Sequence, residues 1–125
     1  MPTSSPRRVL PCLFTSDMRA TLDFYTRVLG FTQTGYFPIA SDPVQTEVRR
    51  DEAAFIFFTD LPHFQGETPA CSGIFFVFPE NIDSLADEIR DQVEILWGPE
   101  EALGMRHFAI RDPNGYTLAF AERSR

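Results

Sequence analysis

The chain has 125 residues, 43% of them hydrophobic, which is enough to bury one core and too few for two ordinary domains. Lys and Arg number 11 against 18 Asp and Glu, so the net charge is −7, without any basic run. This balance excludes the phosphate attraction that drives nucleic-acid binding, and it disfavours anionic membranes as partners. Residues 1–7, expected to form a disordered tail, lack the apolar stretch of a signal peptide, and the sequence offers no membrane span. A cytoplasmic location is expected.

The cysteine and aromatic contents give two further expectations. Cys12 and Cys71 lie in apolar stretches, without CxxC spacing or a neighbouring His. Two reduced cysteines in a cytosolic core are expected, with a disulfide or a thiol nucleophile as the alternatives. The chain has thirteen Phe, three Tyr and one Trp, more aromatic residues than packing alone needs in so small a domain. Some of them are therefore expected to line a hollow.

The first half of the chain predicts one strand, one helix and three further strands. The apolar run from Val9 to Phe14 is typical of a buried strand, and Thr15-Ser16-Asp17 is typical of a helix start. From Met18 apolar residues recur at helical spacing, and Gly30 stands where a left-handed C-cap is expected. Turn-forming residues then separate three extended segments: 31–39, 44–50 and 53–59.

The second half repeats this order. After a loop over 60–69, the apolar run from Gly73 to Phe78 predicts a strand, and Asn81 is the expected cap of the next helix. The apolar face of that helix contains Ile82, Leu85, Ala86 and Ile89. Strands are predicted at 92–97, 105–110 and 117–122. Turns are predicted at Gly98-Pro99, at Gly104 and at the hairpin Asp112-Pro113-Asn114-Gly115.

The repeated order indicates a tandem duplication of a βαβββ module. An offset of 63 residues sets these residues opposite one another: Leu22 and Leu85, Phe14 and Val77, Asp17 and Glu80. Neither module buries its apolar face alone, so the two are expected to pack or curl together around a concave trough, or around a filled core. The expected α+β domain spans 8–123, with module one at 8–60, a linker at 61–70 and module two at 71–123.

Two segments carry a resemblance to a known superfamily. The stretch from Thr15 to Phe31 resembles the opening "D…A..FY...LGF" of modules in the vicinal-oxygen-chelate (VOC) superfamily of glyoxalases, bleomycin-resistance proteins and extradiol dioxygenases. The stretch from Gly104 to Tyr116 is similar to the closing "GMR.F...DP.GN" hairpin. Together they bracket about the whole of residues 8–123. The resemblance implies a curled eight-stranded fold and a homodimer, on a scaffold that hosts several activities.

The resemblance also implies positions for a divalent metal. The family His on the first strand corresponds to Leu10, its partner in the second half to Ile74, or to Gly73 if the register slips by one, and the closing Glu to Ala119. A fourth ligand would come from residues 53–58, which offer no donor atom. These side chains cannot ligate a divalent ion. We therefore expect neither a metal nor another cofactor.

Two histidines remain as candidate polar groups. His63 lies in the loop between the halves, where a solvated side chain is expected. His107 lies on the penultimate predicted strand; it is expected to be a surface or hydrogen-bonded histidine, with a role as donor or base in the trough as the alternative.

The charged residues of the strands leave the same question open. Glu47 and Arg49 share one strand face, and they are expected to form an exposed ion pair, with trough polar groups as the alternative. Arg106 and Arg111 are open to both readings, because one arginine in an apolar trough would bind a ligand carboxylate or phosphate.

With the metal positions apolar, the sequence favours a metal-independent protein that binds a small molecule, as bleomycin-resistance proteins sequester antibiotics. The expected ligand is aromatic or amphipathic, and catalysis is not expected. The lining residues predicted from strand position are Phe37, Phe55, Phe57, Phe76, Trp97, Met105 and His107. The alternatives are a VOC enzyme (a lyase, isomerase or dioxygenase-like enzyme) with metal ligands elsewhere or with His107 and Glu47 as an acid–base pair, and a purely structural or regulatory dimer.

Overall fold

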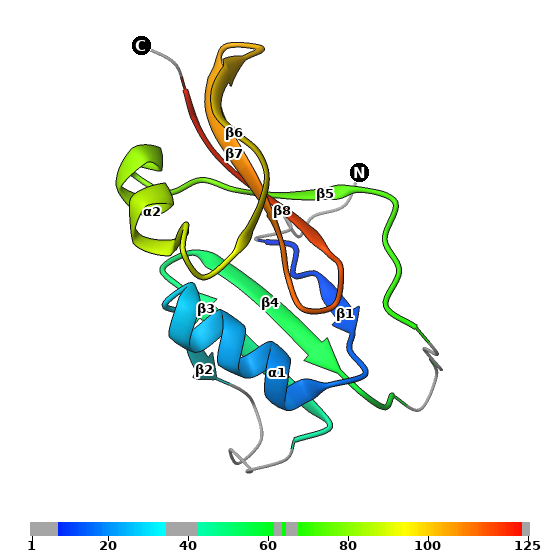
Figure 1. The fold of residues 1–125 in the computed structure, drawn as a ribbon. Helices are drawn as coiled ribbons and strands as arrows, with labels where there is room; N and C mark the ends of the chain where they lie inside the picture. Colours follow the sequence, from blue (N-terminus) through cyan, green and yellow to red (C-terminus); the bar gives the residue numbers. More distant parts are fainter. Residues whose placement is uncertain (1–7, 35–42, 62–63, 65–67, 124–125) are drawn as a thin grey trace.

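The computed structural model describes residues 8–34, 43–61, 64 and 68–123. It contains the predicted order of strands and helices twice over, and the expected α+β class is confirmed (Figure 1). The elements are β1 (Cys12–Phe14), α1 (Met18–Asp23), the π-helix η1 (Phe24–Val28), β2 (Thr32–Thr34), β3 (Gln45–Arg50), β4 (Ala53–Phe58), β5 (Ile74–Val77), α2 (Ile82–Ile89), β6 (Glu94–Ala102), β7 (Met105–Arg111) and β8 (Thr117–Arg123).

The eight strands form two mixed sheets of four strands each. Sheet one has the order β1-β4-β3-β2 and sheet two the order β5-β8-β7-β6. In each sheet the first strand of the module pairs in parallel with the last strand, and the remaining pairs are antiparallel. This identical topology is what a duplicated βαβββ module requires.

Both helices begin at the caps that the sequence predicts. The Asp17 carboxylate accepts a hydrogen bond from the amide of Ala20 at 3.0 Å, and the Asn81 side chain accepts one from the amide of Ser84 at 2.9 Å. Each oxygen satisfies an amide that has no partner within its own helix. Gly30 follows the π-helix with φ at +75°, a backbone angle that favours glycine.

The predicted alignment of the two halves is one residue out at the start of each module. Asp17 corresponds to the cap Asn81 and not to Glu80, so the offset there is 64 residues. Leu13 of β1 pairs with Phe57 of β4, and the corresponding pair in module two is Val77 with Phe120; all four lie on the helix side. Phe57 and Phe120 are 63 positions apart, so the offset has returned to 63 by the last strand. Module one therefore contains one extra residue. The modules differ in length at several points, among them η1, which module two lacks, and the connection between their third and fourth strands, which has two residues in module one and five in module two.

The hydrophobic core is continuous through both modules. Tyr25 is fully buried at its centre in module one, and its ring contacts Phe31, Phe55 and Phe57 at centroid distances of 5.7, 5.6 and 4.8 Å. Phe55 in turn meets Phe75 of module two at 5.9 Å. Such tilted and edge-to-face pairs are the arrangements that aromatic quadrupoles favour.

Polar contacts join the predicted β7 to β8 hairpin turn to module one. The Tyr25 hydroxyl donates to Asp112 Oδ2 at 2.8 Å, and the Asn114 amide group donates to Thr21 Oγ1 at 2.9 Å. Burial raises the pKa of Asp112, while the hydrogen bond from Tyr25 lowers it. The Tyr116 hydroxyl donates to the Phe14 carbonyl at 2.6 Å. Side chains almost a hundred residues apart thus hold the turn of module two against the first helix.

Several expectations are corrected. Gly98 and Pro99, predicted as a turn, lie inside β6, where the register with β7 shifts on both sides of Trp97. Cys12 and Cys71 are exposed free thiols and not core residues. Residues 1–7, the expected tail, lie outside the described residues, as do Phe37 and His63. Among the described residues no helix is long and apolar enough to cross a membrane.

Candidate functional site

Each sheet has one face covered by its helix and a second face, here called the open face, that points away from it. On the open face of sheet two, Trp97 pairs with Ala109, Ala109 with Ala119, and Ala119 with Phe76. Four adjacent strands place the backbones of Trp97 and Phe76 about 14 Å apart. The two alanines are fully buried, whereas Trp97 and Phe76 remain partly exposed, so aromatic rings make up the surface here.

Trp97 and His107 form a hydrogen-bonded pair beside this row. The indole Nε1–H donates to His107 Nδ1 at 3.1 Å. Because Nδ1 accepts, the neutral imidazole carries its proton on Nε2, which is a donor. His107 pairs with Ala121, another fully buried alanine. The open face of sheet two therefore combines ring surface with one oriented polar group.

The structure separates the seven residues predicted to line a trough. Phe76, Trp97, Met105 and His107 share the open face of sheet two. Phe55 and Phe57 lie on the helix-covered face of sheet one, where they are 3% and 0% exposed within the core. Phe37 lies outside the described residues.

The positions that correspond to family metal ligands do not fit a metal. Ile74 and Ala119 lie on the open face of sheet two, and neither side chain has a donor atom. Leu10, just before β1, is equally apolar, and the open-face position of β4 in register with Cys12 is Ile56. Within residues 8–34, 43–61, 64 and 68–123, no group of three or more His, Cys, Asp or Glu side chains could hold a metal ion.

Glu47 and Arg49 pair on the open face of sheet one, but the expectation of an exposed pair is wrong for Glu47. Its side chain is only 8% exposed, and Arg49 contacts Oε2 at 3.1 Å. Thr34 Oγ1 donates to the same oxygen at 2.9 Å. Oε1 is buried without a hydrogen-bond partner, the one such side-chain atom among the described residues. An unsatisfied buried acceptor of this kind is available to a donor from outside the chain.

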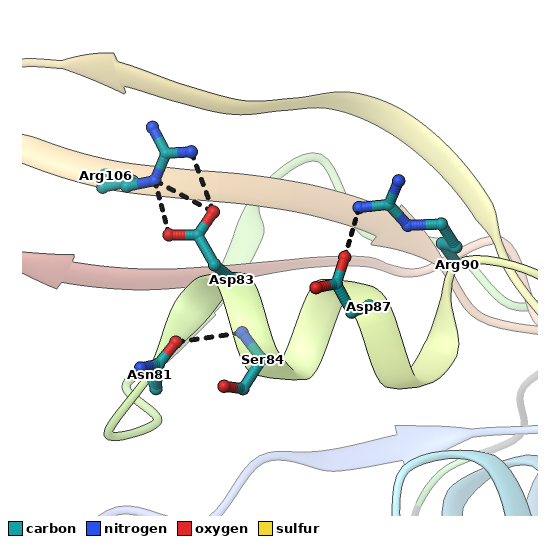
Figure 2. Close-up of polar contacts among 6 residues, drawn as sticks. All are labelled: Asn81, Asp83, Ser84, Asp87, Arg90 and Arg106. Atoms are coloured by element: carbon teal, nitrogen blue, oxygen red, sulfur yellow. Dashed lines mark hydrogen bonds and ion pairs between the residues drawn. The ribbon is translucent and has the colours of Figure 1, made fainter.

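Arg106 and Arg111, whose facing the sequence left undecided, lie on opposite faces of sheet two. Arg106 lies on the helix-covered face of sheet two and forms a two-pronged ion pair with Asp83 of α2, with its closest contact at 2.8 Å (Figure 2). This contact lowers the pKa of Asp83 and raises that of Arg106. Arg111 is exposed on the open face, paired in register with Thr117. Of the two, Arg111 alone stands on the face with Trp97.

A groove of about 850 Å³ lies between the two modules. Its walls come from the segment after η1, the turn between β3 and β4, the end of β5 and the first turns of α2. Of the predicted lining residues that the structure describes, Phe76 alone borders it. The neighbouring Phe78 stacks on Phe76 with ring centroids 6.3 Å apart and an interplanar angle of 19°.

Sequence reasoning missed Phe78 and the alanines at 109 and 121, and it named Ala119 only as the position of a family metal ligand. Both had a signal in the period of two along a strand: Phe76 and Phe78 alternate in one run, as do Ala119 and Ala121 in another. The acidic groove wall had no such signal, because its residues come from segments about thirty positions apart in the chain.

The chain resembles solved structures along its whole length. A virulence protein from Salmonella typhimurium shares 21% identity with a TM-score of 0.76, covering 98% of this chain and all of that one. An antibiotic-binding protein from Streptomyces shares 16% identity with a TM-score of 0.72, covering 97% and 100% of the two chains. A superfamily member from Sphaerobacter thermophilus shares 22% identity with a TM-score of 0.70, covering 94% and 98%.

At these identities the likeness concerns the fold. No curated protein matches the chain. The family model of the Glyoxalase/Bleomycin resistance protein/Dioxygenase superfamily matches residues 8–120. This chain therefore belongs to the glyoxalase/bleomycin-resistance/dioxygenase superfamily, as the resemblance in its first helix and last hairpin predicts.

Proposed function

We propose that this protein is a metal-independent, non-catalytic small-molecule-binding protein that holds an aromatic or amphipathic ligand on the open face of sheet two. The observation that carries the proposal is the hydrogen-bonded pair of Trp97 and His107 beside a row of buried alanines that ends at Phe76. Ring surfaces bind flat apolar groups through area and stacking, without any chemical step. The Nε2 donor of His107 supplies orientation.

The apolar family-ligand positions support binding without metal. Ile74 and Ala119 flank the ring surface on the same face. These two side chains offer no ligand atom to a metal ion. A flat ligand on this face would instead meet apolar side chains.

Sequestration of an antibiotic by a cytoplasmic homodimer is the finer form of this proposal. The likeness to an antibiotic-binding protein from Streptomyces supports it at the level of the fold. The two exposed free thiols, Cys12 and Cys71, fit a reducing compartment.

Trp97 gives the direct test, because it is the single tryptophan of the chain. Titration of a library of planar aromatic compounds is expected to quench or shift its fluorescence. Trp97→Ala is expected to weaken binding at least about threefold, since stacking contributes about 1 kcal/mol. Trp97 lies at the edge of sheet two and is partly exposed, so the variant should still fold cooperatively.

The matched control is Phe64→Ala, which removes another exposed ring that lies away from sheet two. It should leave binding unchanged. A library without any fluorescence response, combined with a large drop in the melting temperature of Trp97→Ala, would assign Trp97 to the core and remove the proposal's main support.

Chelation tests metal independence. A metal that binds the native state raises stability by mass action, so its removal lowers the melting temperature. We expect EDTA to leave both the melting temperature and the Trp97 response unchanged, because Ile74 and Ala119 offer no ligand atoms. Elemental analysis that finds one tightly bound Zn, Fe, Mn or Ni per chain would contradict this.

A further inference from the structure

The groove between the modules shares Phe76 with the ring surface of the open face, but neither Trp97 nor His107 lines it. Its volume of about 850 Å³ is within the range of roughly 300–1,000 Å³ typical of small-molecule pockets. Figure 1 shows α2 lying over the connection between β3 and β4, and both segments line the groove. A pocket of this size suits a compact organic molecule better than a folded partner.

One wall of the groove is an exposed aromatic pair. Phe76 and Phe78 are 48% and 68% exposed, although their rings stack on each other. Burial of such rings by a ligand is favourable because it removes apolar area from water. Ring faces also attract cations electrostatically.

The charged residues of the groove are mostly acidic. Asp51, Glu52, Glu80 and Glu88 line the groove, against the single guanidinium of Arg50. None of the four carboxylates forms an ion pair within the described part of the chain. Arg50 Nη1 donates to the Leu29 carbonyl at 2.8 Å, which holds its charge at one end of the groove.

The start of α2 does not offset this negative field. A helix N-terminus attracts anions through its free amides and its dipole. Here Asn81 already accepts from the Ser84 amide, and the Asp83 carboxylate stands in the first turn (Figure 2). The N-terminus therefore offers little attraction to an anionic ligand.

We propose that this groove binds a planar organic cation, with the aromatic body against Phe76 and Phe78 and the protonated amine among the carboxylates. This site goes beyond the proposed function and is independent of Trp97. A second copy of the chain is disfavoured as the occupant, because each copy carries a net charge of −7.

Three matched probes separate charge from shape: 2-(1-naphthyl)ethylamine, protonated at pH 7, the neutral 2-(1-naphthyl)ethanol and the anion 1-naphthylacetate. Affinities come from isothermal titration, and the site comes from backbone amide shifts in NMR spectra. The amine is expected to bind at least about tenfold more tightly than the anion and to shift the amides of Glu52 and Ser84. Its affinity should fall with added salt.

Variants locate the charge. Glu80→Gln with Glu88→Gln is expected to weaken amine binding roughly three- to tenfold, as expected for two exposed ion pairs. The alcohol should be unaffected. Asp60→Asn with Asp91→Asn removes the same charge from exposed positions outside the groove, and it should change amine affinity less than twofold. Phe78→Leu, which keeps apolar bulk without a ring, should weaken the amine more than it weakens binding of a small alkyl ammonium ion.

The proposal fails if the three probes bind equally, if the groove amides do not shift, or if both double variants weaken the amine equally. A second copy seated in the groove would be displaced by the amine, so a light-scattering mass that falls as the amine binds also overturns it. Trp97→Ala should leave amine binding intact. A loss of the Trp97 response with retained amine shifts would reject the open-face site alone, and the reverse would reject the groove alone.

Discussion

Among single residues, the hydrogen bond between Tyr25 and the buried carboxyl of Asp112 makes the stability of the contact between the two modules dependent on pH. Burial raises the pKa of Asp112, and the hydrogen bond from Tyr25 opposes that shift by stabilising the ionised form. Because the folded-state pKa is raised, the contribution of this group to stability is full below the ordinary pKa of about 3.9 and is lost as the pH rises through the raised value.

Tyr25→Phe should therefore destabilise the protein in a pH-dependent way. Without the hydroxyl, the ionised Asp112 loses a donor, and the free energy of unfolding should fall by about 1–3 kcal/mol at pH 7. The loss should be smaller below about pH 3.9, where the carboxyl is protonated. Urea unfolding across this range measures both values. Tyr116→Phe is the control, since its hydroxyl donates to the Phe14 carbonyl, which does not titrate; equal pH dependence in both variants would contradict the coupling.

At the scale of elements, β6 depends on a glycine at the point where its register shifts. Gly98 has φ at +83°, and a Cβ there would overlap the His107 carbonyl oxygen of the neighbouring strand. The backbones of β6 and β7 thus approach too closely for any side chain at this position. That close approach lies next to Trp97 and His107, so it helps to position the pair.

Gly98→Ala is expected to destabilise the protein by more than Gly104→Ala. Both glycines have positive φ, which costs a residue with a Cβ about 1–3 kcal/mol. Gly104, however, has open space around it, whereas Gly98 adds overpacking worth about 1–3 kcal/mol. Denaturant midpoints measure the difference. Similar losses in the two variants would show that the overlap with His107 is relieved at no cost.

For the molecule as a whole, the position of β5 at the edge of its sheet leads us to predict self-association. It is an edge strand of sheet two, and Ile74 on its open face is 45% exposed. Edge strands with exposed apolar side chains promote pairing between chains. The negative charge of each copy opposes association, so the dimer should tighten with salt.

Light scattering at micromolar concentration is expected to give twice the 14.2 kDa mass of the chain. Ile74→Ser should shift the equilibrium toward the monomer. Leu103→Ser, at a hairpin tip where the side chain is 96% exposed, should leave the mass unchanged. A monomer mass for the wild-type protein at this concentration would reject the dimer.

The kinds of elements, their order and their caps could be predicted from the amino-acid sequence alone. Asp17 and Asn81 begin helices, and Asp112 to Gly115 turn a hairpin, because these effects act between residues a few positions apart. The duplication followed from that order. Its exact offset did not, because small differences in the lengths of the helices, strands and turns shift the alignment without changing the order of the elements.

The face that each strand presents, and the residues that surround it, depend on contacts that form only in the folded molecule. The strand positions predicted that Phe55, Phe57 and Trp97 line one trough. In the structure, Phe55 and Phe57 lie on the helix-covered face of sheet one, whereas Trp97 lies on the open face of sheet two. A shift of one residue reverses facing along a strand, so the outcome depends on which residues become strand partners, such as Leu13 for Phe57 and Ala109 for Trp97. The acidic residues of the groove come from segments that meet only when the modules pack, and Glu47 meets Thr34 only when β2 pairs with β3.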